Sequence, residues 1–121
     1  GGFIDVFCYP FCRGRIFNTI ERDKGQYDSQ ANIFWASGAG FATKKDIFFK
    51  AGMFDTKLFA HMEEIDYHWR CQMMGYKIIA CPDSVILHEG GATLSYKSYK
   101  KTKKSRRNSL YCFARNGYDI Y

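Results

Sequence analysis

Residues 61–70 constrain the fold most, because apolar side chains recur there and just beyond at helical spacing. At 100° per residue, four of them fall on one stripe: Met62, Ile65, Trp69 and Met73. The sequence therefore predicts a helix over 63–74 that packs on a core through this stripe. Gly75 is its expected C-terminal cap.

Three carboxylates stand in the first turn of this helix: Glu63, Glu64 and Asp66. The helix dipole favours acids at this end, which is one explanation of the cluster. Asp66 shares a flank with Glu63 and forms a solvated i,i+4 pair with Arg70, whereas Glu64 lies beside the apolar stripe. Partial desolvation raises the pKa of a carboxyl group and suits it to proton abstraction. Glu64 is therefore the preferred candidate for a general base.

The chain has 121 residues, of which 46% are apolar and 18% aromatic, enough for one domain spanning 1–121 with its own core. It contains no apolar run of about eighteen residues and no signal-peptide pattern, so neither a membrane span nor secretion is predicted. The start at Gly1-Gly2, without an initiator Met, suggests a fragment.

The five cysteines are an odd number at irregular spacing. This argues against a disulfide framework and favours a reducing, cytoplasmic compartment, with the cysteines as small core residues. Cys8 and Cys12 lack a second pair at zinc-site spacing, so structural zinc is not expected.

Positive charge is concentrated between Lys97 and Arg107, where seven Lys and Arg side chains occur without an acid. Removing these seven from the net charge of +6 leaves −1, so the basic character belongs to the segment at 95–108. With Tyr96 and Tyr99 interleaved, this segment suits nucleic acid or an anionic membrane surface. A solvated linker that leads into the last helix is the third interpretation.

Short apolar runs and turn residues predict the remaining elements. Strands are expected at 3–9, 32–43, 76–81 and 85–87, and helices at 44–51 and 104–116. Thr43 is the expected N-cap of the first of these helices, with Gly52 and Gly117 at the two C-terminal ends. Loops are expected at 11–15, 21–30 and 53–60, and a turn at 82–84.

Two further features indicate ligand contacts. Small residues interrupt the strand at 36–42, where glycine permits a bulge or a close approach, although Gly-Ala-Gly lacks the spacing of a dinucleotide-binding fingerprint. His88 follows the strand at 85–87 and precedes glycines, a position from which α/β proteins contact ligands, with plain hydrogen bonding as the alternative. A metal held by His61, Glu64 and His68 is disfavoured, because no further ligand is obvious.

Six segments of the chain follow one another in the order and spacing seen in one known protein family: 34–40, 52–55, 59–70, 75–77, 82–84 and 88–94. In this order the chain resembles the C-terminal half of family 2 glycosyltransferases. It is most similar to the bacterial rhamnosyltransferase-like members that build surface polysaccharides of the cell envelope. The resemblance extends over nearly the whole chain.

The resemblance implies an α/β chain with an incomplete GT-A-like mixed sheet and flanking helices. The N-terminal nucleotide-binding half and its Asp-x-Asp metal motif do not occur in the sequence. The implied partners are a nucleotide-sugar donor and a saccharide or lipid-linked acceptor, at the cytoplasmic face of the inner membrane. This chain alone is predicted to be inactive and to bind nucleotide-sugar weakly, and no specific nucleic acid is implied.

The resemblance also assigns roles to residues. Glu64 matches the base that deprotonates the acceptor hydroxyl in an inverting transfer, Asp66 is the second choice, and Glu63 is the neighbouring acid. The family usually has Glu-Asp at this point, so the extra methylene of Glu64 shifts the base by about 1 Å. His88 matches a ligand of the Mg²⁺ or Mn²⁺ ion that bridges the donor diphosphate, although no tightly bound ion is expected in this chain. The substrate-binding positions implied are Trp35, Ser37, Gly38, Ala39, Gly40 and Arg107.

Two rival functions remain open at this point. In a small basic nucleic-acid-binding module, binding would be steeply salt-dependent and would survive the loss of Glu64. In a membrane-surface adaptor, binding to anionic liposomes would depend on the cations of the basic segment.

Overall fold

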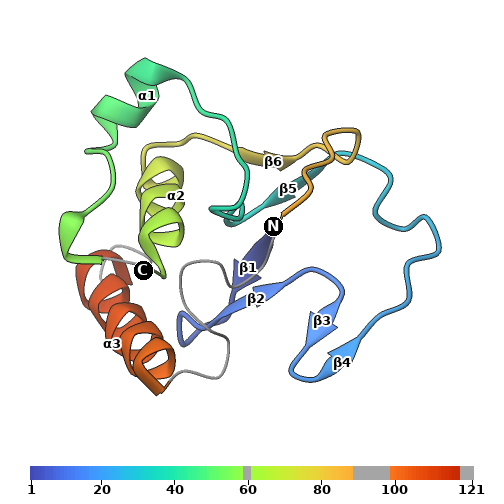
Figure 1. Cartoon of the computed structure of the whole chain (residues 1–121). Helices are drawn as coiled ribbons and strands as arrows, with labels where there is room; N and C mark the ends of the chain where they lie inside the picture. Colours follow the sequence, from blue (N-terminus) through green and yellow to red (C-terminus); the bar gives the residue numbers. More distant parts are fainter. Residues whose placement is uncertain (59–60, 89–98, 118–121) are drawn as a thin grey trace.

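The computed structural model describes residues 1–58, 61–88 and 99–117, and Figure 1 shows their arrangement. The start of the basic segment, with Tyr96 and Lys97, lies outside these residues. So do residues 59–60 and 89–94, which belong to the family-like pieces. No helix in the described part of the chain combines the length and the apolar character needed to cross a bilayer.

The described strands form three antiparallel pairs. Strand β1 (Gly2–Ile4) pairs with β2 (Pro10–Cys12), β3 (Arg15–Ile16) with β4 (Thr19–Ile20), and β5 (Ala31–Ile33) with β6 (Ile78–Ala80). An isolated bridge links Gly2 to Trp35, with the Gly2 N–H donating to the Trp35 carbonyl oxygen at 2.9 Å. Through this bridge, β1 contacts the chain just after β5.

Gly2 is required by this close pairing. An added Cβ would meet the backbone carbonyl oxygen of Phe11 and, at 2.8 Å, the indole ring of Trp35. A backbone atom cannot move aside as a flexible side chain can, so only glycine lets β1 pass between β2 and Trp35.

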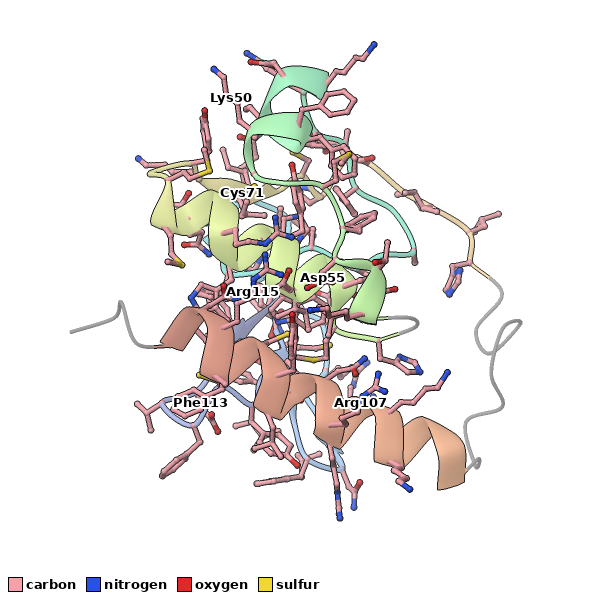
Figure 2. The ribbon with its side chains drawn as sticks, turned by 90° about the vertical axis from the view of Figure 1, so that its left-hand side faces the viewer. Lys50, Asp55, Cys71, Arg107, Phe113 and Arg115 are labelled. Atoms are coloured by element: carbon pink, nitrogen blue, oxygen red, sulfur yellow. The ribbon has the colours of Figure 1, made fainter. Side chains whose placement is uncertain are left out.

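The helices are α1 (Lys45–Lys50), the 3₁₀ turn η1 (Thr56–Leu58), α2 (Glu63–Met73) and α3 (Tyr99–Asn116). Figures 1 and 2 show α2 between α1 and α3. Because α2 is covered on several sides, five consecutive residues, 65–69, are buried. The chain is therefore mixed α/β, as expected, with short antiparallel sheets and α2 at its centre.

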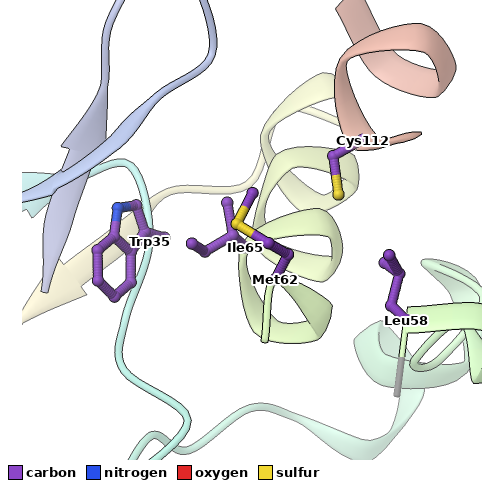
Figure 3. Close-up of a cluster of buried hydrophobic side chains, with 5 residues drawn as sticks. All are labelled: Trp35, Leu58, Met62, Ile65 and Cys112. Carbon is purple, nitrogen blue, oxygen red and sulfur yellow. The ribbon is translucent and has the colours of Figure 1, made fainter. Parts of the chain in front are cut away.

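The core has two parts that meet along α2. One contains Trp35, Leu58, Met62, Ile65 and Cys112, shown in Figure 3. The other contains Ala51, Tyr67 and Cys71, with Phe41, Ile47, Phe48, Tyr76 and Ile78 packed against it. The predicted apolar stripe is confirmed at Met62, Ile65 and Trp69. Met73 is 46% exposed, because the last turns of α2 contact the second part of the core through Tyr67 and Cys71 instead.

Several element predictions are confirmed. Helix α2 begins and ends within one residue of the predicted bounds, and Gly75 has the left-handed φ of +83° expected of a C-terminal glycine. Strand β6 lies inside the predicted 76–81, and the turn at 82–84 is closed by the Ser84 N–H and the Cys81 carbonyl oxygen. Helix α3 covers the predicted 104–116 and begins earlier, at Tyr99.

Other element predictions are wrong, each for a local reason. The strand expected at 3–9 ends at Ile4, because the Asp5 carboxylate accepts hydrogen bonds from the Phe7 and Tyr9 N–H groups and turns the chain. The loop expected at 11–15 contains the end of β2 and the start of β3. The strand expected at 32–43 stops at Ile33, and the segment 85–87 forms no strand, its side chains being largely exposed.

The expected N-cap of α1 is also wrong. The Thr43 hydroxyl is 2.8 Å from the Tyr67 hydroxyl and bonds to it instead, so Lys44 stands at the N-cap position without a side-chain cap. The hydroxyl of Thr43 thus ties the segment before α1 to the middle of α2.

All five cysteines are unpaired. Cys8, Cys71 and Cys112 are buried, as expected of core residues, whereas Cys12 and Cys81 are exposed. Burial raises the pKa of the Cys112 thiol to about 12, which keeps it a neutral core side chain.

Candidate functional site

A hollow of about 930 Å³ opens beside the start of α2 and contains the preferred catalytic residue, Glu64. Its volume lies within the range of small-molecule sites. Its wall is built from the β1–β2 turn, strands β2 and β3 with the residue that follows β3, Trp35, the start of α2 and one residue of α3. The lining residues that matter below are Tyr9, Phe11, Phe17, Trp35, Glu64 and Ser105.

Glu64 is largely enclosed, and its carboxyl group faces the glycine segment. A Cβ placed on Gly38 would lie 3.6 Å from Oε1 of Glu64, and the Gly38 N–H interacts with the carboxylate. The other oxygen, Oε2, is buried without a hydrogen-bond partner. A buried carboxylate oxygen without a donor destabilises the folded state, so this arrangement calls for an explanation beyond stability.

Burial raises the pKa of Glu64 above its ordinary value. The nearby charge of Glu63 raises it further, and backbone N–H groups, including that of Gly38, oppose the shift. A carboxylate with a raised pKa binds a proton more strongly, which is the property needed in a general base that works near neutral pH.

The backbone that leads into α2 is strained. His61 and Met62 both have left-handed φ angles of 79°, which residues with a Cβ rarely adopt. Buried Asn108 of α3 fixes this turn, since its Nδ2 donates to the His61 carbonyl oxygen at 2.7 Å. Backbone strain of this kind occurs where a functional side chain must be held in a defined position. Here the strained turn fixes the orientation of the first turn of α2, which carries Glu64.

Trp35 lines the same hollow and is held firmly. Its Nε1 donates to the Phe3 carbonyl oxygen at 3.0 Å, and the side chain is 9% exposed. A fixed indole ring in the wall of a hollow gives that wall a rigid apolar surface.

A second hollow of about 590 Å³ lies on the other side of the glycine segment. Ser37 and Gly40 line this second hollow rather than the first. Within the segment, the Gly40 N–H donates to the Ser37 carbonyl oxygen and the Ala39 N–H to the Ser37 hydroxyl. The predicted substrate-binding residues are therefore divided: Trp35 borders Glu64 in one hollow, Gly38 touches Glu64, and Ser37 and Gly40 face the other.

Asp66 lies elsewhere and is not a solvated residue. It is fully buried, and its Oδ2 accepts hydrogen bonds from Arg70 at 2.8 and 3.0 Å while its Oδ1 accepts one from Asn116 at 2.9 Å. The prediction of a solvated pair with Arg70 is wrong, because α3 packs over this flank of α2. With both oxygens occupied, Asp66 is better suited to joining α2 and α3 than to proton transfer.

The remaining predicted residues lie apart from Glu64. Glu63 is half-buried with Oε2 enclosed, yet it lines neither hollow. Arg107 contacts Asn108 and the Lys57 carbonyl oxygen, so it supports the strained turn. His88 is exposed at the end of a segment without regular structure.

No three His, Cys, Asp or Glu side chains among residues 1–58, 61–88 and 103–117 gather closely enough to hold a metal ion. Within that part of the chain, His88 therefore belongs to no group of three such side chains, and the divalent ion expected at His88 stays a prediction. A metal ion thus enters no step proposed below.

Four of the lining residues named above, Tyr9, Phe11, Phe17 and Ser105, were not identified from the sequence. Tyr9 and Phe11 line the hollow but stand in segments predicted as a strand and a loop, and Ser105 was hidden in the basic segment. The density of aromatic residues between Phe3 and Phe17 was the available signal, since an aromatic wall is common in saccharide and ligand sites.

His68 gives the structure a testable pH dependence. It is 3% exposed, its Nδ1 accepts a hydrogen bond from the Ala36 N–H at 3.4 Å, and burial lowers its pKa from 6.5 to about 4. The unfolded chain therefore binds the His68 proton more readily than the folded chain. The neutral, buried His68 therefore contributes to the stability of the folded state fully above pH 6.5, and this contribution is lost as the pH falls toward 4.

We expect this histidine alone to lower the free energy of unfolding by roughly 3 kcal/mol across that pH window. Urea unfolding followed by tryptophan fluorescence at several pH values would measure it. His68→Gln retains an acceptor for the Ala36 N–H and should flatten the curve between pH 6.5 and 4. Parallel curves for the two proteins would show that His68 does not titrate in this way.

No protein-family model matches the chain, and no solved structure matches it. Among curated proteins, the chain is 27% identical over 79 residues to the N-acetylglucosaminyl-diphospho-decaprenol L-rhamnosyltransferase of Mycobacterium tuberculosis strain CDC 1551 / Oshkosh. Its counterpart in strain ATCC 25618 / H37Rv matches equally well. The similarity is to a glycosyltransferase. It is distant, covering 65% of this chain and 26% of the rhamnosyltransferase, so the chain spans about a quarter of the length of the curated relatives it matches.

Proposed function

We propose that this chain forms the acceptor side of an inverting glycosyltransferase in which Glu64 is the general base. The single observation that carries the proposal is the buried Oε2 of Glu64, which has no hydrogen-bond partner and belongs to a side chain lining the 930 Å³ hollow. An acceptor hydroxyl would supply the missing donor once a shift of the side chain opens Oε2 to the hollow. The distant similarity to a rhamnosyltransferase supports the same reaction class.

In the proposed reaction, an acceptor hydroxyl enters the hollow and donates a hydrogen bond to Glu64. Its oxygen attacks the anomeric carbon of the sugar of a nucleotide-sugar as the bond from that carbon to the diphosphate oxygen breaks. The proton passes to the Glu64 carboxylate, and the nucleoside diphosphate leaves with the electron pair. Because the attack comes from the face opposite the leaving group, the anomeric configuration is inverted.

The nucleotide-sugar itself would bind mainly to residues beyond this chain, in the N-terminal half of a GT-A fold. Strands β5 and β6 would extend the mixed sheet of that fold. The proposed contribution of this chain is the acceptor wall. Trp35 gives the wall a fixed apolar side chain, and Gly38 lies directly beside the Glu64 carboxyl group.

The acceptor class follows from the name of the rhamnosyltransferase, which specifies a saccharide on a polyprenyl diphosphate. We propose that the chain accepts a saccharide on a lipid diphosphate, with transfer at the cytoplasmic membrane face. An aromatic wall composed of Tyr9, Phe11, Phe17 and Trp35 is consistent with a sugar that carries an apolar tail.

Acceptor binding can be tested on the chain itself, since its only two tryptophans provide probe and control. We expect a soluble short-chain prenyl-diphosphate N-acetylglucosamine to shift the indole N–H signal of Trp35 in a ¹⁵N-correlation spectrum. Trp69 is 2% exposed and lines neither hollow, so its indole signal should stay in place. No shift of the Trp35 signal at millimolar acceptor, or equal shifts of both, would reject the proposed acceptor site.

A further inference from the structure

Asn108 and Ser109 of α3 contact the two strained residues that precede α2. The Asn108 Nδ2 donates to the His61 carbonyl oxygen at 2.7 Å, and the Ser109 hydroxyl donates to the Met62 sulfur at 3.6 Å. Both contacted residues have left-handed φ angles of 79°. A residue with a Cβ keeps such a conformation only where its surroundings hold it there. These contacts from α3 are therefore part of what holds the turn in place.

Arg107 determines which way the Asn108 amide points. Its Nε and Nη2 both donate to Oδ1 of Asn108, at 2.9 and 2.7 Å. A guanidinium group has only donors, so the completely buried amide must turn its oxygen toward Arg107. The amide nitrogen then faces the His61 carbonyl oxygen, and rotating the amide by half a turn would break the hydrogen bonds at both ends. Arg107 and Asn108 thus form one unit that donates a hydrogen bond to the turn.

The same turn determines the surroundings of the Glu64 carboxyl group. Helix α2 begins directly after Met62, whose carbonyl oxygen accepts a hydrogen bond from the Asp66 N–H at 2.8 Å. The carboxylate of Glu64 interacts with its own N–H and with those of Ile65 and Gly38. A rotation of the first turn of α2 would therefore move the carboxyl group away from Gly38 and let water reach it.

We propose that Asn108, oriented by Arg107, is a positioning residue for Glu64 and keeps its carboxyl group in the wall of the 930 Å³ hollow. Arg107 acts on the site through Asn108 and the turn, which differs from the substrate contact implied by the family resemblance. The effect on sugar transfer rests on the proposed function. The placement of the carboxyl group is a property of this chain and can be tested without transfer.

A second asparagine of α3 provides a matched control. Asn116 is also buried, and its Nδ2 also donates one hydrogen bond, but the acceptor is Oδ1 of Asp66, at 2.9 Å. Asn108→Ala and Asn116→Ala each remove one buried donor from the same helix, and only the first removes a contact with the turn. The side chains around Glu64 that can carry charge near neutral pH are unchanged in both variants: Asp5, Arg15, His61 and Glu63.

The ¹³C signal of the Glu64 carboxyl group, titrated in this chain, tests the placement directly. Burial is the largest cause of the raised pKa of Glu64. We expect Asn108→Ala to admit water and to move the titration midpoint down toward the ordinary glutamate value, whereas Asn116→Ala should leave the midpoint unchanged. A midpoint that stays in place in Asn108→Ala, or that moves as far in Asn116→Ala, would overturn the positioning role.

A milder pair of variants covers the case in which Asn108→Ala does not fold. Arg107→Ala removes an exposed side chain that orients Asn108, and Arg106→Ala removes an equal charge from the neighbouring exposed position. We expect the Glu64 midpoint to fall in Arg107→Ala and to stay in place in Arg106→Ala. Equal midpoints in these two variants would count against the proposal.

Transfer kinetics separate this positioning role from a general loss of stability. We expect Asn108→Ala to lower kcat by roughly 10- to 100-fold and to change the KM for the acceptor far less, since a small displacement of a catalytic group costs rate more than binding. Added to Glu64→Gln, the same substitution should cost little more, because it acts through a side chain already disabled. An equal loss in both backgrounds would contradict the positioning role. Full activity of Glu64→Gln alone would reject the proposed reaction, and the carboxyl titration would still decide the role of Asn108.

Discussion

In a glycosyltransferase that contains this chain, Glu64→Gln is expected to lower the rate of glycosyl transfer roughly 10²- to 10⁴-fold. The amide has nearly the shape of the carboxylate but cannot accept the proton of the acceptor hydroxyl. The loss should therefore appear in kcat more than in KM, because the acceptor still finds its hollow. In the unchanged enzyme the rate should rise with pH through the raised pKa of Glu64, since only the ionised form is a base. Transfer to the lipid-linked acceptor, followed with a radiolabelled sugar, would measure both effects.

The same substitution should leave the fold at least as stable. A buried carboxylate oxygen without a hydrogen-bond partner opposes folding, and an uncharged amide is less costly to bury. Glu63→Gln is the matched control, because it changes the adjacent acid, which lines neither hollow, and should retain most of the activity. If Glu64→Gln retains full activity, or if Glu63→Gln loses as much, Glu64 is not the base.

The helical wheel was sufficient to separate Glu64 from the other two acids, because the side chains around one helix are ordered by local geometry alone. It failed for Asp66, whose environment is set by residues about fifty positions away on α3. Arg70 was paired with Asp66 correctly, yet nothing in residues 61–70 indicated that Asn116 would enclose that pair. Local periodicity identifies which flank a residue occupies, whereas burial of the flank depends on tertiary contacts.

The walls of the hollow were the least predictable part. Strands β3 and β4 have two residues each, too few to show an alternating pattern. The turn at Asp5 arises from one side chain that caps two N–H groups, inside a run that otherwise reads as a strand. The apolar residues 85–87 show the opposite error, since strand composition without a pairing partner leaves them exposed. Trp35 was named as a substrate-binding residue through the family resemblance, and it lines the hollow, but its bridge to Gly2 was not predicted.

The buried join between α2 and α3 gives the largest expected effect on stability. Asp66→Ala should lower the free energy of unfolding by about 3–5 kcal/mol, because it leaves the Arg70 guanidinium group and the Asn116 amide without their acceptor in a buried site. Against a total of about 5–15 kcal/mol for a domain, that loss is large. Urea unfolding, read from tryptophan fluorescence, would measure it.

Two variants distinguish a special role of Asp66 from a general effect of removing an acid. Asp46→Ala deletes an exposed acid in the first turn of α1 and should change stability by less than about 0.5 kcal/mol. Asn116→Ala removes only the hydrogen bond to Oδ1 of Asp66 and should cost about 1–3 kcal/mol, since one buried acceptor loses one donor. If Asp66→Ala is no more destabilising than Asp46→Ala, the buried network does not hold α3 against α2. The position of Asn108, and with it the strained turn that aims Glu64, would then have to be fixed by apolar packing around Cys112 and Ile65.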